Sequence, residues 1–243
     1  MVNLYDTHFH LDLQQSKDIA LAEINRNRIY TIAVTNLPPL YEKLSKEINT
    51  KYVRVALGFH PELIGQFQKY IPDMWRLLPD AKYIGEVGID SKVGKDTKNI
   101  QISFFEELIQ RCSEIGNKII SIHSRASASD VISIIGNNFN GKIILHWYSG
   151  TKQNQEQAIQ NGFYFSVNHA MLNSESGRKV ITNIPDDKIL IETDSPFVSL
   201  GSNSYTELIK KTIEEIAQIK GFTTEVMENL FWNNFRTLLI SQE

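Results

Sequence analysis

Short apolar segments alternate along this chain with longer amphipathic ones. Eight short segments are rich in Ile, Val, Leu and aromatic side chains, a pattern typical of parallel strands that are buried on both faces. They cover residues 4–8, 29–34, 52–57, 83–87, 118–123, 143–146, 163–167 and 189–193. We expect the amphipathic stretches between them to form helices that cover these strands.

Three of the predicted helices are well marked in the sequence. The clearest covers residues 98–115, where apolar side chains recur every three or four positions and form one stripe. The stripe consists of Ile100, Phe104, Leu108, Cys112 and Ile115. A second helix begins at Ser204, which forms a capping-box pattern with Glu207, and ends at Gly221. A last helix over residues 225–239 is expected to pack across the outside.

Eight strands separated by helices predict an α/β fold, with a (β/α)₈ barrel as the favoured arrangement. A barrel of this kind needs about 250 residues, so residues 1–243 are expected to form one domain. An open, doubly wound sheet is the alternative. The chain has neither GxGxxG nor GxxxxGK[ST], the usual nucleotide-binding patterns of that second fold.

Composition excludes several classes of protein. Apolar residues make up 42% of the chain and the net charge is −3, which excludes intrinsic disorder. A single cysteine, Cys112, excludes a disulfide framework and favours a reducing compartment. We see no signal peptide and no apolar run near the ~18 residues that span a bilayer, so we expect a cytoplasmic protein without membrane contact. The charge argues against a broad basic surface for duplex DNA but allows a local phosphate site.

Histidines and carboxylates follow the predicted strands at their carboxyl ends. They are His8, His10, Glu86, His123, His146 and Asp194. In a barrel these ends meet at one mouth, where barrel enzymes build their active sites. The alternative is a set of hydrogen-bonded core histidines and structural carboxylates, but clustered buried carboxylates repel one another without a cation.

This donor set predicts a site for divalent metal. Imidazole and carboxylate ligands suit Zn²⁺ or Mn²⁺, and Mg²⁺ where oxygen ligands dominate. Six ligands exceed the needs of one catalytic ion, so two ions bridged by Glu86 are expected.

Six motifs in order carry a resemblance to a known family. They are DTHFHLD, GFHPE, IGEVGID, SIHSR, ILHWYSG and ETDSPF, which together span most of the chain. This set resembles the TatD family of metal-dependent deoxyribonucleases. SIHSR, LHWYSG and FSVNHAMLNSESGR further resemble the TatD-like nuclease of Qat anti-phage clusters. The resemblance implies a distorted, amidohydrolase-like TIM barrel that hydrolyses DNA, often in the 3′→5′ direction.

The resemblance also implies a role for each site residue. One ion takes His8, His10, Glu86 and Asp194, and the second takes Glu86, His123 and His146. Asp194 is the general base. His60 and Arg125 contact the substrate phosphate. Glu192 shares the face of Asp194, which favours a role in holding the ligands in place.

Aromatic residues beside these ligands suggest what binds there. Trp147 is expected to contact substrate, whereas Phe9 and Phe59 are expected to pack in the core. Asp90 has two open interpretations, hydrogen bonding within its loop or substrate contact. The expected partners are DNA with single-stranded or frayed ends and proteins of a defence operon.

Two rival functions remain open. One is an amidohydrolase-type enzyme that opens an amide or lactone; many such enzymes use a carboxylated lysine at strand four, but Lys82 lies at the wrong end of that strand. The other is a catalytically silent subunit that binds DNA ends. The segments 91–95 and 201–205 differ from the family pattern and line the mouth, so substrate length and strand preference depend on them.

Overall fold

The computed structural model describes residues 4–92, 97–198 and 204–240. Two segments, 91–95 and 201–205, differ from the family pattern. Their residues 93–95 and 201–203 lie outside the described residues. Within the described residues, all eight predicted strands are confirmed, and their ends differ from the predicted ends by at most two residues. The strands are β1 (Tyr5–Phe9), β2 (Tyr30–Ala33), β3 (Val53–Val55), β4 (Tyr83–Gly88), β5 (Lys118–His123), β6 (Gly141–His146), β7 (Tyr164–Val167) and β8 (Ile189–Ile191).

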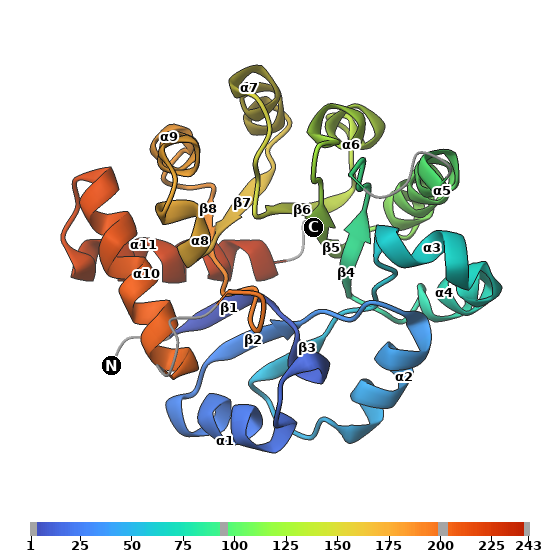
Figure 1. Cartoon of the computed structure of the whole chain (residues 1–243), viewed down its shortest axis with the longest axis horizontal. Helices are drawn as coiled ribbons and strands as arrows, with labels where there is room; N and C mark the ends of the chain where they lie inside the picture. The colour runs from blue at the N-terminus through green and yellow to red at the C-terminus, as the bar shows by residue number, and fades with distance from the viewer. Residues whose placement is uncertain (1–3, 93–96, 199–203, 241–243) are drawn as a thin grey trace.

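All the strand pairs are parallel and form two sheets. One has the order β1-β2-β3 and the other β4-β5-β6-β7-β8. Figure 1 shows the strands at the centre with helices arranged around them. The chain therefore has the predicted α/β barrel-like fold, but its ladder of hydrogen bonds is interrupted at two seams among the described residues. These interruptions make it a distorted barrel.

A few backbone hydrogen bonds bridge each seam. Between β3 and β4, Gly85 N donates to Leu57 O at 2.9 Å. Between β8 and β1, Asp194 N donates to His8 O at 2.9 Å and His10 N donates to Ser195 O at 3.0 Å. The second seam thus holds four residues of the DTHFHLD and ETDSPF motifs next to each other.

Gly58 is required at the seam between β3 and β4. A Cβ atom at this position would lie 1.5 Å from Thr35 O and 2.6 Å from Gly85 O. Only glycine lets the backbone approach this closely. The glycine of the GFHPE motif therefore keeps His60, two residues later, close to the strand ends.

The helices surround the strands and alternate with them. They are α1 (Lys17–Asn27), α2 (Pro38–Glu47), α3 (Pro61–Phe67), α4 (Ile71–Leu77), α5 (Lys98–Ile115), α6 (Ala128–Ile135), α7 (Lys152–Gln160), α8 (His169–Leu172), α9 (Glu175–Asn183), α10 (Tyr205–Lys220) and α11 (Thr224–Leu239), with short 3₁₀ turns η1 (Leu11–Leu13) and η2 (Gln68–Tyr70). The bounds of α5 and the capping box of α10 are confirmed. No helix of the described residues has the length and hydropathy that crossing a membrane requires.

Helix α11 lies in a different place from the one expected. The ring of Phe235 stacks on Tyr5 at 4.2 Å, and Asn234 Nδ2 donates to Ile189 O at 2.8 Å. Tyr5 and Ile189 begin β1 and β8, so α11 covers the amino end of the barrel rather than packing across its outside. Helix α11 therefore does not cover the carboxyl end of the barrel, where the predicted ligands lie.

Candidate metal centre

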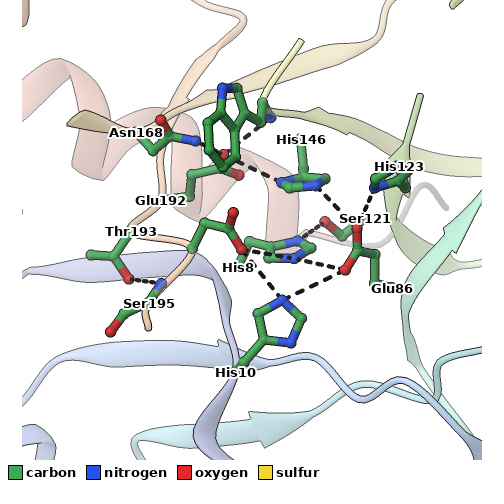
Figure 2. Close-up of polar contacts among 12 residues, drawn as sticks. His8, His10, Glu86, Ser121, His123, His146, Asn168, Glu192, Thr193 and Ser195 are labelled. Atoms are coloured by element: carbon green, nitrogen blue, oxygen red, sulfur yellow. Dashed lines mark hydrogen bonds and ion pairs between the residues drawn. The ribbon is translucent and has the colours of Figure 1, made fainter. Parts of the chain in front are cut away.

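The six predicted ligands meet at the carboxyl ends of the strands. His8 lies in β1, Glu86 in β4, and His123 and His146 end β5 and β6. His10 follows β1, and Asp194 follows β8. Figure 2 shows His8, His10, Glu86, His123 and His146 converging on one region. This region forms the wall of a cavity of about 530 Å³.

The first group of ligands surrounds one oxygen of Glu86. His8 Nε2 and His10 Nε2 lie 3.6 Å and 3.5 Å from Glu86 Oε2. The same two nitrogens lie 3.8 Å and 3.3 Å from Asp194 Oδ1. All four side chains are almost fully buried. Their ligand atoms match the set that the family resemblance implies for one ion.

A second group surrounds the other oxygen of Glu86. His123 Nδ1 lies 2.6 Å from Glu86 Oε1, and His146 Nε2 lies 3.2 Å from it. His60 Nε2 also lies close, at 3.4 Å. The structure therefore brings His60 next to the second group of ligands, and not only to the cavity wall where a phosphate contact was expected.

Polar partners lie close to the outer nitrogens of three of these rings. His8 Nδ1 lies 2.7 Å from Ser121 Oγ, and His123 Nε2 donates to Asp90 Oδ2 at 2.7 Å. His146 Nδ1 lies 3.4 Å from Glu192 Oε1. Each ring thus presents its other nitrogen to Glu86, an arrangement typical of histidines that bind metal.

Asp90 is a residue whose role the sequence left open. Its side chain is fully buried, and the same Oδ2 also lies 2.8 Å from Arg125 Nε. Lys92 N donates to Oδ1 at 2.7 Å. Burial by itself would raise the pKa of Asp90, but the hydrogen bonds from His123 and Lys92 lower it to about 2. Asp90 is therefore a charged residue that fixes both His123 and Arg125.

Glu192 occupies the position that its spacing from Asp194 predicts. Its Oε1 accepts hydrogen bonds from Trp147 N at 3.0 Å and from Asn168 Nδ2 at 2.9 Å, and its Oε2 accepts one from Ser166 Oγ. Burial opposes ionisation, but the attraction of His146 and these hydrogen bonds keep the pKa of Glu192 below its usual value. Its negative charge is therefore available to orient His146.

The arrangement fits a cation better than it fits a closed hydrogen-bond network. His8 Nε2, which lies 3.6 Å from Glu86 Oε2, is buried and has no hydrogen-bond partner among the described residues. Burial would raise the pKa of Glu86, but His60 and His146 attract its charge and hold its pKa well below the usual range. An ionised Glu86 beside an unpaired imidazole nitrogen is the donor chemistry that a divalent ion takes.

Two signals in the sequence were available for residues that were missed. Ser121 lies two positions before His123 and so faces the same side of β5. Ser166 and Asn168 have the same spacing at the end of β7. The role of Asp90, which the sequence left open, has no such periodic signal, because Asp90 contacts His123 and Arg125, which lie 33 and 35 residues further along the chain.

Lys82 and His169 lie apart from the cluster. Lys82 Nζ lies 3.5 Å from Leu239 O, at the amino end of β4, which removes the carboxylated-lysine arrangement from consideration. His169 lies in α8, outside the three groups of metal-ligand geometry among the described residues. Trp147 and Arg125 both line the cavity.

The barrel and its histidine–carboxylate cluster define a metal-dependent hydrolase. A family model described as TatD related DNase matches residues 5–240, so the chain belongs to this family.

Named relatives and a solved structure agree with this assignment. The chain is 27% identical to an uncharacterized metal-dependent hydrolase, YabD, of Bacillus subtilis, over 97% of this chain and 98% of that protein. It is 27% identical to a mouse protein named as a candidate deoxyribonuclease, TATDN3, over 96% of this chain and 87% of that protein. The crystal structure of YjjV, a TatD homologue of Escherichia coli, has the same fold with a TM-score of 0.85 at 20% identity, covering 97% of each chain.

Proposed function

We propose that this protein hydrolyses phosphodiester bonds of DNA at single-stranded or frayed ends, with two divalent ions of Zn²⁺, Mn²⁺ or Mg²⁺. One observation carries the proposal: the two oxygens of Glu86 face two separate groups of ligand atoms. A single carboxylate between two such groups is the arrangement that two-metal phosphoesterases use. The naming of TATDN3 as a deoxyribonuclease supports DNA as the substrate.

Each side chain has a defined part in this reaction. His8, His10, Glu86 and Asp194 would hold one ion, and Glu86, His123 and His146 the other. Bound ions would supply Lewis-acid activation of water and charge neutralisation at the phosphate.

Three side chains would carry out proton transfer and phosphate binding. Asp194 lies at the cavity wall, where its carboxylate can accept the proton of the attacking water. His60 and Arg125 line the same cavity and can donate hydrogen bonds to the non-bridging oxygens of the phosphate.

The test is a nuclease assay with controlled metal content. Chelator-treated protein is supplied with Zn²⁺, Mn²⁺ or Mg²⁺ and given labelled single-stranded and duplex DNA. We expect cleavage that requires metal and prefers single strands. Turnover that persists in excess chelator would contradict the proposal, as would hydrolysis confined to an amide or lactone panel. Binding of DNA ends without cleavage under every metal condition would favour the silent subunit.

The variant Asp194→Asn tests the assigned base. The substitution keeps the shape of the side chain and removes its basicity, so we expect cleavage to fall by at least about a hundredfold while the thermal unfolding profile stays that of a folded barrel. Full turnover in this variant would remove Asp194 from the role of base.

Defence against phage is a separate prediction. We propose it on the resemblance to nucleases of Qat clusters alone. Plaque counts on cells that carry the complete gene cluster, with the wild-type chain or with Asp194→Asn, measure it. Equal plaque counts would exclude a catalytic role in defence.

A further inference from the structure

The aromatic residues of this protein are buried or half-buried with two exceptions. The chain has 3 Trp, 9 Tyr and 12 Phe, and all of them fall within the described residues. Only Trp147 and Phe197 are exposed, at 37% and 64%. Both line the cavity that holds the candidate metal ligands. Two exposed aromatic rings at one cavity indicate a binding surface rather than chance exposure.

The position of Trp147 is fixed by its backbone. It directly follows His146, has a φ of 40°, and donates its N–H to the buried Glu192. A bulky residue with positive φ is strained, and such strain is typical of binding and active sites. The backbone of Trp147 is therefore held at the cavity, and 37% of the residue stays exposed there.

Phe197 is held at the cavity by contacts at the seam between β8 and β1. Its N–H donates to Asp194 O at 2.9 Å, and its ring meets His10 edge-on at 5.1 Å between centroids. Each exposed ring is thus attached to a candidate ligand, Trp147 to His146 and Phe197 to both His10 and Asp194. A group bound against either ring lies directly beside the phosphate site.

The neighbouring aromatic residues do not share this exposure. Phe9, Phe59 and Tyr148 are at most 1% exposed. Phe9 packs against Tyr205 and Phe59 against Phe104. These rings belong to the core, so among the described residues only Trp147 and Phe197 present exposed aromatic faces at the cavity.

We propose that Trp147 and Phe197 form a stacking subsite for the unpaired bases that flank the scissile phosphate; this rests on the proposed phosphodiesterase function. Aromatic rings stack on the faces of bases, and those faces are available only when the bases are unstacked from a duplex. The subsite therefore selects nucleic-acid ends whose bases are free. Arg125 also lines the cavity and would bind the phosphate rather than the base.

The experiment compares two oligonucleotides that differ only in their bases. One is single-stranded DNA, and the other has the same backbone with abasic residues at the cleaved end. We expect wild-type protein to prefer the base-bearing substrate in kcat/KM by tenfold or more, since stacking on one ring changes affinity by about that factor. Trp147→Leu and Phe197→Leu should each reduce this preference, and the double variant should bring it near one. Ile19→Ala removes an exposed apolar side chain of α1 that does not line the cavity, and should keep the wild-type preference.

Binding without turnover separates this inference from the proposed function. Fluorescence anisotropy in EDTA measures the affinity of the same chains for the two labelled oligonucleotides. Tighter binding of the base-bearing strand, lost in the double variant, supports the subsite even if the protein cleaves neither strand. Cleavage with equal kcat/KM for both strands would overturn the subsite and leave the phosphodiesterase intact. Equal or undetectable binding of both strands would also overturn it.

Discussion

Asp90 shows how a single buried carboxylate can serve two functional side chains at once. It accepts hydrogen bonds from His123, a candidate ligand, and contacts Arg125, a candidate phosphate contact. Its own N–H donates to Gln101 Oε1 at 2.8 Å, which ties it to α5. Arg125 has a second, half-exposed partner in Glu62 at 3.0 Å. Asp90 and Glu62 both contact Arg125, but only Asp90 contacts His123. Substitutions at these two residues should therefore differ in their effect on metal binding.

The substitution Asp90→Asn should weaken metal binding. The amide cannot accept hydrogen bonds from His123, Arg125 and Lys92 together, so the His123 ring loses its fixed orientation. Loss of such a supporting partner typically lowers metal affinity by about 10- to 100-fold. Competition with a chromophoric chelator measures the affinity for Zn²⁺ and Mn²⁺.

Glu62→Gln is the matched control for that measurement. Glu62 contacts Arg125 but lies outside the ligand groups among the described residues, so metal affinity should stay at the wild-type value. Equal affinity in wild type and Asp90→Asn, with both proteins folded by circular dichroism, would show that Asp90 does not position His123.

At the scale of elements, the start of α10 is fixed from several sides. Ser204 and Glu207 form the reciprocal capping box. Thr206 N donates to Glu23 Oε1 at 2.8 Å, and Tyr205 OH donates to Asp6 Oδ2 at 3.0 Å. Asp6 in turn accepts the N–H of His8 at 2.9 Å. The first turn of α10 is thereby linked to β1, which carries His8 and leads into His10.

Ser204→Ala should destabilise the protein through this helix start. The variant leaves the N–H of Glu207 without its capping acceptor, which typically lowers the free energy of unfolding by about 1 kcal/mol. Urea denaturation measures the change. Ser204→Thr keeps a capping hydroxyl and should lie close to wild type. An Ala variant as stable as the Thr variant would show that the contacts of Thr206 and Tyr205 suffice to start the helix.

At the scale of the whole molecule, the ligand cluster lies across both seams of the barrel. His8 comes from the three-stranded sheet, whereas Glu86 comes from the five-stranded sheet. Glu86 N donates to Thr35 O across one seam, and Asp194 N donates to His8 O across the other. Bound ions would therefore connect the two sheets at the open end of the barrel, while α11 covers the opposite end.

Metal should consequently stabilise the fold. An ion that binds only the folded chain at 100 times its Kd adds about 2.7 kcal/mol, which corresponds to roughly 5–11 °C in Tm for a domain of this size. Differential scanning fluorimetry with chelator and then with Zn²⁺ or Mn²⁺ measures the shift, with KCl of equal ionic strength as the control. Asp194→Asn should show a smaller shift. A Tm that does not respond to either ion would contradict metal binding at this cluster.

The sequence by itself determined the elements and the identity of the cluster. The strands and α5 follow from apolar periodicity, which depends on neighbouring residues and can be read locally. The convergence of His8, Glu86, His123 and His146 follows as well, because parallel strands place their carboxyl ends at one side of the fold.

Only the tertiary structure decided how side chains from distant segments pair. The sequence does not indicate that Asp90 holds His123, that His60 lies 3.4 Å from Glu86, or that α11 covers the amino end of the barrel. Phe9 and Phe197 each lie within three residues of a ligand, yet one is buried and the other exposed. These outcomes depend on which surfaces meet after the two sheets close on each other, and no local pattern of residues records that geometry.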